Sequence, residues 1–363
     1  MNSLDPRLTT LNQQPFCAVR FLGDCVDMLD QRVLPHKVEY NRYYQFEDLA
    51  QAITDMVVRG APAIGIAAAY GVVLAAKHQS TQPSLDLTSA LSTLAASRPT
   101  AVNLFWALKK MEDCWKGHST LPVDEQIRKL EHLAIEIHQQ DVDNNLKMGE
   151  LGASLIQANS QIYTHCNAGA LATGGHGTAL GVIRSAHALG KIQHVYAGET
   201  RPWWQGSRLT AWELMQDRIP VTLSTEGAAG QLFRQGHIQW VIVGADRIAA
   251  NGDVANKVGT YNLAVLAKHH GMKVMVVAPT STFDWQLSSG EDIPIEHRPM
   301  EEVTHTKGNP IAPLNCQAIN PSFDVTPHAL IDAIVCEAGI INQPNDEAMS
   351  ALKSTLDNSE SDA

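Results

Sequence analysis

The sequence has little positive charge and few aromatic residues. Its 363 residues hold 27 Lys and Arg against 38 Asp and Glu, which gives a formal net charge of −11. Broad binding to nucleic-acid phosphates requires clustered positive charge, so this composition argues against a nucleic-acid partner. A small anionic ligand remains compatible with it, because a local pocket can be positive on an acidic protein.

Cysteines are also few and widely separated. The six of them form no Cys-x-x-Cys pair, and no group of histidines has the spacing of zinc ligands. The first ten residues, MNSLDPRLTT, lack the apolar core of a signal peptide. We therefore expect a cytoplasmic protein whose thiols are reduced.

Long hydrophobic runs are missing as well. The longest apolar run, APAIGIAAAYGVVLAA at 61–76, is short and rich in Ala and Gly, which makes it a poor membrane span. It is better interpreted as a buried helix. We expect no membrane partner.

The first part of the chain, residues 1–158, is expected to form a small domain that combines short strands with helices. Within 15–45, short β-like pieces are broken by turn residues, which is typical of a small antiparallel sheet. Hydrophobic periodicity then predicts four helices. Their ranges are 46–58, 61–77, 101–116 and 124–156.

After residue 158, short apolar strands alternate with helical patterns. Such alternation implies right-handed crossovers and a parallel, doubly wound sheet, so 159–345 should form a Rossmann-like α/β domain. The expected strands are 161–166, 192–198, 221–225, 240–246 and 273–279, and the expected helices lie near 177–189, 206–217, 227–235 and 255–270. A polar loop at 290–315, a helix near 327–338 and a weakly ordered acidic tail at 346–363 should complete the chain.

Ligands of such sheets bind beyond the carboxyl ends of the strands, so the residues found there are candidates for function. Cys166 ends the first expected strand and precedes a glycine-rich segment, NAGALATGGHGTALGVI. A thiol beside free backbone N–H groups could be activated, but a lone cysteine is often only a buried structural residue. Its position alone favours neither interpretation.

Asp246 closes the apolar run WVIVGAD. Desolvation there should raise its pKa toward the working range of a general acid. It could instead cap the next turn or pair with Arg247. The polar residues at 251–257 follow before a helix, where they could hold a phosphate or a sugar hydroxyl.

Arg59 and Arg98 each come just before a proline that could open a helix, and an arginine beside free helix N–H groups can bind a phosphate. Each of them could equally be solvated or form an ion pair that only supports packing. Trp203 and Trp204 could form the wall of a pocket or lie in the core.

A dinucleotide-binding loop is a competing interpretation of the glycine-rich segment. The stretch Gly175-His176-Gly177 resembles part of the fingerprint, and Glu199 ends the next strand where a ribose-binding acid would lie. However, Leu180 occupies the position of the third glycine. A nicotinamide-dependent dehydrogenase therefore ranks below an enzyme that acts on a small phosphate ester.

Taken together, several segments resemble the aldose–ketose isomerases of methylthioribose 1-phosphate, a family related to the regulatory subunits of a eukaryotic translation-initiation exchange factor. The matching segments span most of the chain in the same order. They are RGAPAIG (59–65), SRPTAVNL (97–104), CNAGALATGGHGTALGVI (166–183), ETRPWWQGSRLTAWEL (199–214), GADRIAANGDVANKVGTYNLAV (244–265) and NPSFDVTP (320–327).

The resemblance implies a role for individual residues. Cys166 matches the family's catalytic cysteine and Asp246 its proton donor. The positions that match substrate-binding residues are Arg59, Gly60, Ala61, Arg98, Gln205, Asn256 and Lys257. The family also implies a sugar phosphate as substrate, a homodimer, and no metal or nucleotide cofactor. Small departures from the family pattern occur at 174–176 and at the tryptophan pair 203–204.

On this basis we expect the chain to isomerise 5-methylthioribose 1-phosphate to 5-methylthioribulose 1-phosphate, a step of methionine salvage. One alternative is an isomerase of another pentose 1-phosphate, such as ribose 1,5-bisphosphate or 5-deoxyribose 1-phosphate. Another is a non-catalytic regulatory module like the translation-factor relatives. The wall of the pocket around the sugar's 5-substituent would separate the first two, because a methylthio group needs apolar surface and a second phosphate needs cations.

Overall fold

A computed structural model describes residues 5–99, 101–306 and 308–361, and the chain divides into two compact units. Unit 1 comprises residues up to 146 together with 168–177. Unit 2 comprises 147–167 and the chain from 178 onward. Residues 168–177 of the glycine-rich segment therefore belong to the unit built mainly from the N-terminal part of the chain.

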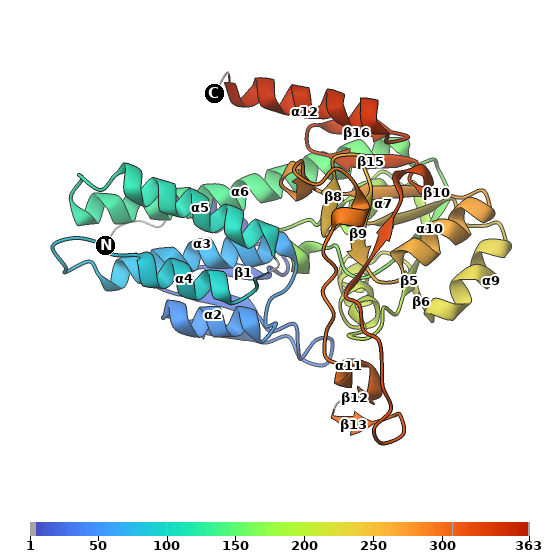
Figure 1. Ribbon diagram of the computed structural model, residues 1–363, viewed down its shortest axis with the longest axis horizontal. Coiled ribbons are helices and arrows are strands. Elements are labelled where there is room, and N and C mark those ends of the chain that lie inside the picture. Colours follow the sequence, from blue (N-terminus) through green and yellow to red (C-terminus); the bar gives the residue numbers. More distant parts are fainter. Residues whose placement is uncertain (1–4, 100, 307, 362–363) are drawn as a thin grey trace. The chain divides into compact units, whose positions relative to one another are not determined.

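Unit 1 is a small antiparallel sheet with helices, as the sequence predicts (Figure 1). Its three strands pair in the order β1-β2-β3. The strands are β1 (Val19–Phe21), β2 (Val26–Leu29) and β3 (Tyr40–Tyr43), and the helices are α1 (Pro6–Asn12), α2 (Phe46–Thr54), α3 (Ala61–His78), α4 (Thr88–Ala96), α5 (Val102–Gly117) and the start of α6 (Val123–Leu155). The four predicted helices are present, whereas α1 and α4 were not predicted.

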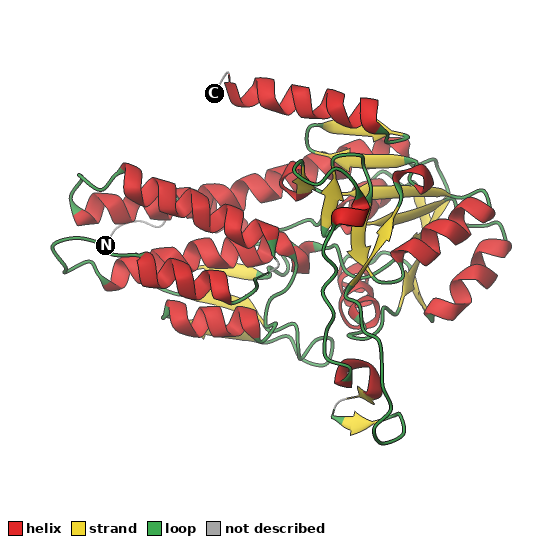
Figure 2. Ribbon diagram, viewed as in Figure 1, coloured by secondary structure: helices red, strands yellow, loops and turns green. Residues whose placement is uncertain are grey.

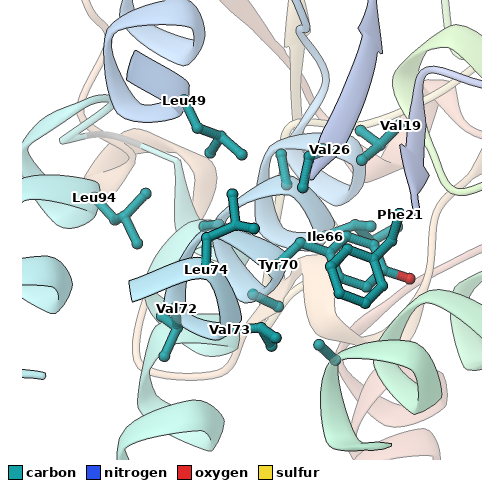
Figure 3. Packing of buried hydrophobic residues seen from close by; sticks show 14 of the residues in the cluster. Val19, Phe21, Val26, Leu49, Ile66, Tyr70, Val72, Val73, Leu74 and Leu94 are labelled. Atoms are coloured by element: carbon teal, nitrogen blue, oxygen red, sulfur yellow. The ribbon is translucent and has the colours of Figure 1, made fainter. Parts of the chain in front are cut away.

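Helix α3 forms the centre of the unit 1 core. Every residue from Ala63 to Ala76 is buried, because Ala and Gly let neighbouring elements approach the helix from all sides. Around it pack Leu49 of α2 and Leu94 of α4, and Phe21 of β1 stacks on Tyr70 with ring centroids 4.5 Å apart (Figure 3). By length and composition α3 could cross a membrane, but most of it is buried within the protein.

Unit 2 is built on a seven-stranded sheet with the order β16-β15-β10-β7-β4-β5-β6. Figure 2 shows strands of this unit in yellow among its red helices. All neighbours are parallel except β15 and β16, which form an antiparallel edge. The strands are β4 (Ser160–Thr164), β5 (Ile192–Gly198), β6 (Val221–Ser224), β7 (Trp240–Val243), β10 (Lys273–Val277), β15 (Ala333–Cys336) and β16 (Gly339–Asn342). The predicted doubly wound α/β fold is therefore confirmed.

The helices of unit 2 cover this sheet. Helices α9 and α10 pack on the face that carries Tyr163, Val241 and Val276, and α7 contacts β5 and β10. Their bounds are α7 (Ala179–Ala188), α8 (Ala211–Gln216), which continues a π-helical turn at Gly206–Thr210, α9 (Ala229–Arg234) and α10 (Thr260–His269). The chain order reverses between β4 and β7, because β5 and β6 lie on one side of β4 while β10 and β15 lie beyond β7.

A second sheet, in the order β11-β8-β9-β14, was not predicted from the sequence. Its strands are β8 (Arg247–Ala249), β9 (Val254–Lys257), β11 (Phe283–Asp284) and β14 (Phe323–Thr326). Between β11 and β14 the chain makes an excursion with α11 (Glu301–Thr304), β12 (His305–Thr306) and β13 (Asn309–Pro310) (Figure 1). Because residues 254–257 form strand β9, helix α10 begins at Thr260 rather than near 255.

Two further expectations near the C-terminus differ from the structure. The helix expected near 327–338 is wrong, since a short 3₁₀ turn at His328–Leu330 is followed by strand β15. The tail expected at 346–363 instead contains helix α12 (Asp346–Ser361). Met349 and Leu352 of α12 are buried in the same hydrophobic cluster as Ile341 of β16, which ties the helix to the sheet.

Candidate active site

Cys166 and Asp246 follow neighbouring parallel strands at the point where the chain order of the sheet reverses. Thr164, the last residue of β4, pairs with Ile242 of β7, so the segments that carry Cys166 and Asp246 leave the same edge of the sheet. In open α/β sheets, a crevice at this topological switch point is the usual place for a ligand. The fold therefore brings the two predicted catalytic residues to one edge.

Cys166 is buried, with 8% of its surface exposed, and its backbone is left-handed, with φ of 60°. Its N–H donates to the hydroxyl of Thr200 (2.9 Å), and its carbonyl accepts from the hydroxyl of Thr210 (2.5 Å). A left-handed conformation is uncommon for a residue other than glycine and marks a position held by its surroundings.

The side chain before it, His165, is completely buried and neutral. Burial lowers the pKa of His165 to about 4. Its Nε2 lies 2.9 Å from the carbonyl oxygen of Val258 and so carries the hydrogen, which leaves Nδ1 as an acceptor 3.4 Å from the hydroxyl of Thr200. His165 therefore links the end of β4 to the segment after β9.

Asp246 is half-buried between β7 and β8. Its N–H donates to the carbonyl of Ala255 (2.9 Å), so Asp246 lies at the open end of the β8–β9 hairpin. The next residue, Arg247, forms an ion pair with Asp284 (3.2 Å). The carboxyl group is thus carried on a paired backbone segment rather than on an open loop.

The polar residues at 251–257 separate into two groups. Asp253 accepts from the side chain of Asn251 (2.9 Å), from the backbone N–H of Gly290 (3.0 Å) and from His328, so it ties loops together. Asn256 and Lys257, by contrast, lie at the end of β9. The Asn256 amide donates to Thr260 (2.9 Å), and the Lys257 ammonium lies 5.0 Å from the centre of the Phe323 ring.

Gln205 lies in the segment that joins β5 to the π-helical turn. It is 6% exposed, and among the residues that the structure describes its Oε1 has no hydrogen-bond partner. A buried amide oxygen of this kind is available to a ligand hydroxyl. The tryptophans before it are not core residues, because Trp203 is 36% exposed and Arg201 stacks on Trp204 at 4.5 Å.

In unit 1, Arg59, Gly60 and Ala61 form the start of α3. Gly60 is its N-cap residue, with φ of 92°, and a Cβ there would lie 2.5 Å from Cβ of Ala172. Only glycine meets both requirements. Arg98 differs from expectation, because Pro99 does not open a helix and α5 begins only at Val102.

The glycine-rich segment at 168–177 is approached closely by the protein itself. The N–H of Gly174 donates to Asp141 (2.6 Å), and its carbonyl lies 3.0 Å from Nε2 of His138. A Cβ at Gly177, where φ is 86°, would lie 2.5 Å from the Cα of Gly169. These glycines therefore serve packing within unit 1.

The dinucleotide interpretation also requires a tight turn between strand and helix. Here the chain leaves unit 2 after Asn167 and returns at Thr178 before α7 begins. The stretch 175–177 consequently does not form the strand-to-helix turn of a Rossmann fingerprint.

Several buried polar residues around Cys166 do not stand out in the sequence. They are His165, Thr200, Thr210 and Glu213, each with no more than 1% of its surface exposed. Thr200, Thr210 and Glu213 lie inside the quoted segment at 199–214, and the last two stand three residues apart on one helical face. That spacing, beside the apolar Leu209 and Leu214, is the signal that the sequence offers for them. Within the described ranges, no three His, Cys, Asp or Glu side chains are grouped as metal ligands.

The fold and the paired strand-end residues define a two-unit α/β protein with a candidate active site on its doubly wound sheet. Its sequence matches the Initiation factor 2 subunit family over residues 57–343, and the chain belongs to that family. It is 56% identical to the methylthioribose-1-phosphate isomerase of Thioalkalivibrio sulfidiphilus, over 92% of this chain and 96% of that protein.

Two solved structures are similar over nearly the whole chain. The 5-methylthioribose 1-phosphate isomerase of Pyrococcus horikoshii has a TM-score of 0.89 and 42% identity, over 97% of this chain and 99% of that one. The translation initiation factor eIF-2B subunit delta of A. fulgidus has a TM-score of 0.80 and the same 42% identity, over 92% of this chain and 99% of that one.

Proposed function

We propose that the chain is an aldose–ketose isomerase that converts 5-methylthioribose 1-phosphate to 5-methylthioribulose 1-phosphate in methionine salvage. The observation that carries the proposal is the placement of Cys166 and Asp246 after neighbouring strands at the switch point of the sheet. The relatives with that activity in their names, at 56% and 42% identity, support the choice of substrate.

The substrate explains why an acid and a thiol are needed. The anomeric carbon of a sugar 1-phosphate is locked as a phosphorylated acetal, so no free aldehyde is available for enediol isomerisation. Asp246, protonated, donates its proton to the ring oxygen and opens the ring. Asp246 is half-buried and follows the apolar strand β7.

Hydrogen then moves from C2 to C1. In our proposal Cys166 lies beside C2, where it either removes the C2 proton as a base and returns it to C1, or stabilises charge during a direct hydride shift. In both cases the C2 hydroxyl gives its proton to the Asp246 carboxylate left by ring opening, and C2 becomes the ketone. Arg59, Arg98 and Lys257 hold the phosphate, so that it is not expelled while positive charge develops at C1. Gly60, Ala61, Gln205 and Asn256 complete the substrate contacts.

The test is turnover of purified variants. Asp246→Asn and Cys166→Ala should each lower kcat by at least about 10²- to 10⁴-fold, the contribution of a positioned acid or base, while the protein stays folded. Cys336→Ala is a matched control, because Cys336 is also buried and ends a strand of the same sheet. A folded Asp246→Asn variant with a near-normal rate would contradict the assignment.

A second candidate function is a non-catalytic regulatory module, favoured by the similarity to the A. fulgidus initiation-factor subunit. It requires that the purified chain turn over no sugar phosphate and form a stable complex with larger partners. Retention of both Cys166 and Asp246 favours the enzyme. Parallel assays with 5-methylthioribose 1-phosphate, ribose 1,5-bisphosphate and 5-deoxyribose 1-phosphate would decide among the substrates.

We also propose that the enzyme acts in the cytoplasm as a homodimer. The dispersed cysteines support the cytoplasmic location. The resemblance to the isomerase family supports the homodimer. Light scattering of the purified protein should give twice the 39.5 kDa mass of the chain.

A further inference from the structure

Side chains form hydrogen bonds with both backbone groups of Cys166, whose conformation is left-handed. Strand β4 ends at Thr164, and at Cys166 the backbone turns into φ of 60°, which L-residues with a Cβ adopt at a cost. Its N–H and its carbonyl bond to the hydroxyls of Thr200 and Thr210. Both threonines are fully buried, so water does not compete for these bonds.

The direction of the Thr210 hydroxyl is set by its neighbours. The side-chain amide of Asn167 donates to the Thr210 oxygen (3.2 Å) and to the carboxylate of Glu213 (2.9 Å). An NH₂ group can only donate, so the Thr210 oxygen is the acceptor there. Its own hydrogen is therefore directed to the carbonyl oxygen of Cys166.

Buried charged side chains fix the position of Asn167, which bonds to Thr210. Glu213 is completely buried, and its second carboxylate oxygen accepts from the Arg184 guanidinium at 2.8 Å. Arg184 also donates to Asp217 at 2.7 Å. Because a buried carboxylate is costly unless it is paired, Glu213 stays fixed between Arg184 and Asn167.

The Thr200 hydroxyl is directed in a similar way on the other side. It accepts from the Cys166 N–H, so its hydrogen points to the carbonyl of Gly198 (3.0 Å) or to Nδ1 of His165 (3.4 Å). Gly206 packs against the same Gly198 carbonyl so closely that a Cβ would lie 1.7 Å from it. The segment that carries Thr200 is therefore tightly held.

We propose that Thr200 and Thr210 are positioning residues, whose two hydroxyl groups hold the backbone of Cys166 in its left-handed conformation and so set the place of its thiol. The inference rests on the proposed catalytic role of Cys166. A displacement of about 1 Å at a reacting group can lower a rate by about 10²-fold. A reaction that needs the thiol beside one carbon atom is sensitive to such a displacement.

The test compares threonine with valine and serine at both positions. Thr200→Val and Thr210→Val keep the shape but remove the hydroxyl, and each should lower kcat by about 10- to 100-fold with KM changed less than about threefold. Thr200→Ser and Thr210→Ser keep the hydroxyl and should restore most of kcat. Should a valine variant not fold, the alanine variant at that position, which leaves room for water, takes its place in the comparison.

Thr164→Val is the matched control. Thr164 is equally buried, and its hydroxyl likewise donates to a backbone carbonyl, that of Ile242 (2.8 Å), but it does not bond to Cys166. The control should lose a similar amount of thermal stability while keeping kcat. Equal loss of kcat in the control would mean that any lost buried hydroxyl impairs the enzyme, which overturns the specific role.

A second measurement does not depend on the proposed function. The rate at which iodoacetamide alkylates Cys166, followed by peptide mass spectrometry, should rise severalfold in the valine variants. The freed backbone should expose the thiol of a residue that is only 8% exposed in the wild type. Unchanged alkylation and unchanged kcat in both valine variants would overturn the proposal, as would serine variants as impaired as valine. Failure of the wild-type protein to isomerise any sugar phosphate would instead refute the proposed function. The alkylation rates would then still test whether Thr200 and Thr210 position Cys166.

Discussion

At the scale of single residues, two buried histidines make the stability of the protein depend on pH. Burial lowers the pKa of both His138 and His165 to about 4, below the ordinary value of 6.5. Between these values the unfolded chain binds protons that the folded chain does not, so stability is complete above about pH 6.5 and falls as pH decreases toward 4. Each histidine should cost on the order of 2 kcal/mol between pH 6.5 and 5.

The measurement is urea unfolding of the wild type and of His138→Gln at pH 7 and pH 5. The variant should lose less stability on acidification than the wild type, because one buried titrating group is gone. His36→Gln, at an exposed position, is the control and should behave like the wild type. An equal loss in all three proteins would show that groups other than His138 set this pH dependence.

The residues of the candidate site were predictable only in part. Cys166 and Asp246 stand out because each follows closely on an apolar strand, and the strand pattern is a local feature of the sequence. Thr200 and Thr210 do not, because their role depends on contacts with Cys166, more than 30 positions away in the chain. The role of Gly60 also depends on a distant residue, Ala172.

At the scale of elements, helix α12 should contribute to stability although its sequence is polar and acidic. Met349 is completely buried in the cluster that includes Ile341, and Leu352 is 9% exposed beside it. Met349→Ala should lower the free energy of unfolding by about 2–5 kcal/mol, the cost of a large-to-small change in a core. Chemical denaturation measures this loss.

Ser350→Ala is the control for this helix, because Ser350 is the exposed neighbour of Met349. It should leave the free energy of unfolding within about 0.5 kcal/mol of the wild type. If Met349→Ala were equally neutral, α12 would not be part of the folded core.

The elements were predicted well where hydrophobic periodicity is long and less well where strands are short. Helix α3 and strands β4 and β5 have strong patterns, and they lie within one or two residues of the expected ends. Hairpin β8–β9 has strands of only three and four residues, and the sequence pattern instead predicts the start of a helix near 255, within β9. Strand β15 was interpreted as part of a helix, because AIVC is too short to distinguish the two periods.

At the scale of the whole molecule, the two units are interleaved in sequence. Segment 168–177 belongs to unit 1, although the chain on both sides of it belongs to unit 2. In unit 1 the segment is anchored through the Leu171 carbonyl, which accepts from Gln31 (2.6 Å), and through Gly174. The residue that we propose as catalytic, Cys166, lies two positions before this crossing.

This interleaving predicts which unit a mutation in the segment destabilises. Leu171 is completely buried, and its turn, Ala170–Ala172, contacts α3 of unit 1, so Leu171→Ala should lower stability there by about 2–5 kcal/mol. Hydrogen exchange followed by mass spectrometry should show protection lost in peptides from 5–146, with peptides from 178–361 less affected. Leu263→Ala, in the core of unit 2, should give the opposite pattern. Loss of protection confined to unit 2 in the Leu171 variant would mean that the glycine-rich segment is stabilised by the Rossmann-like sheet, and that the division of the chain at 167 and 177 is wrong.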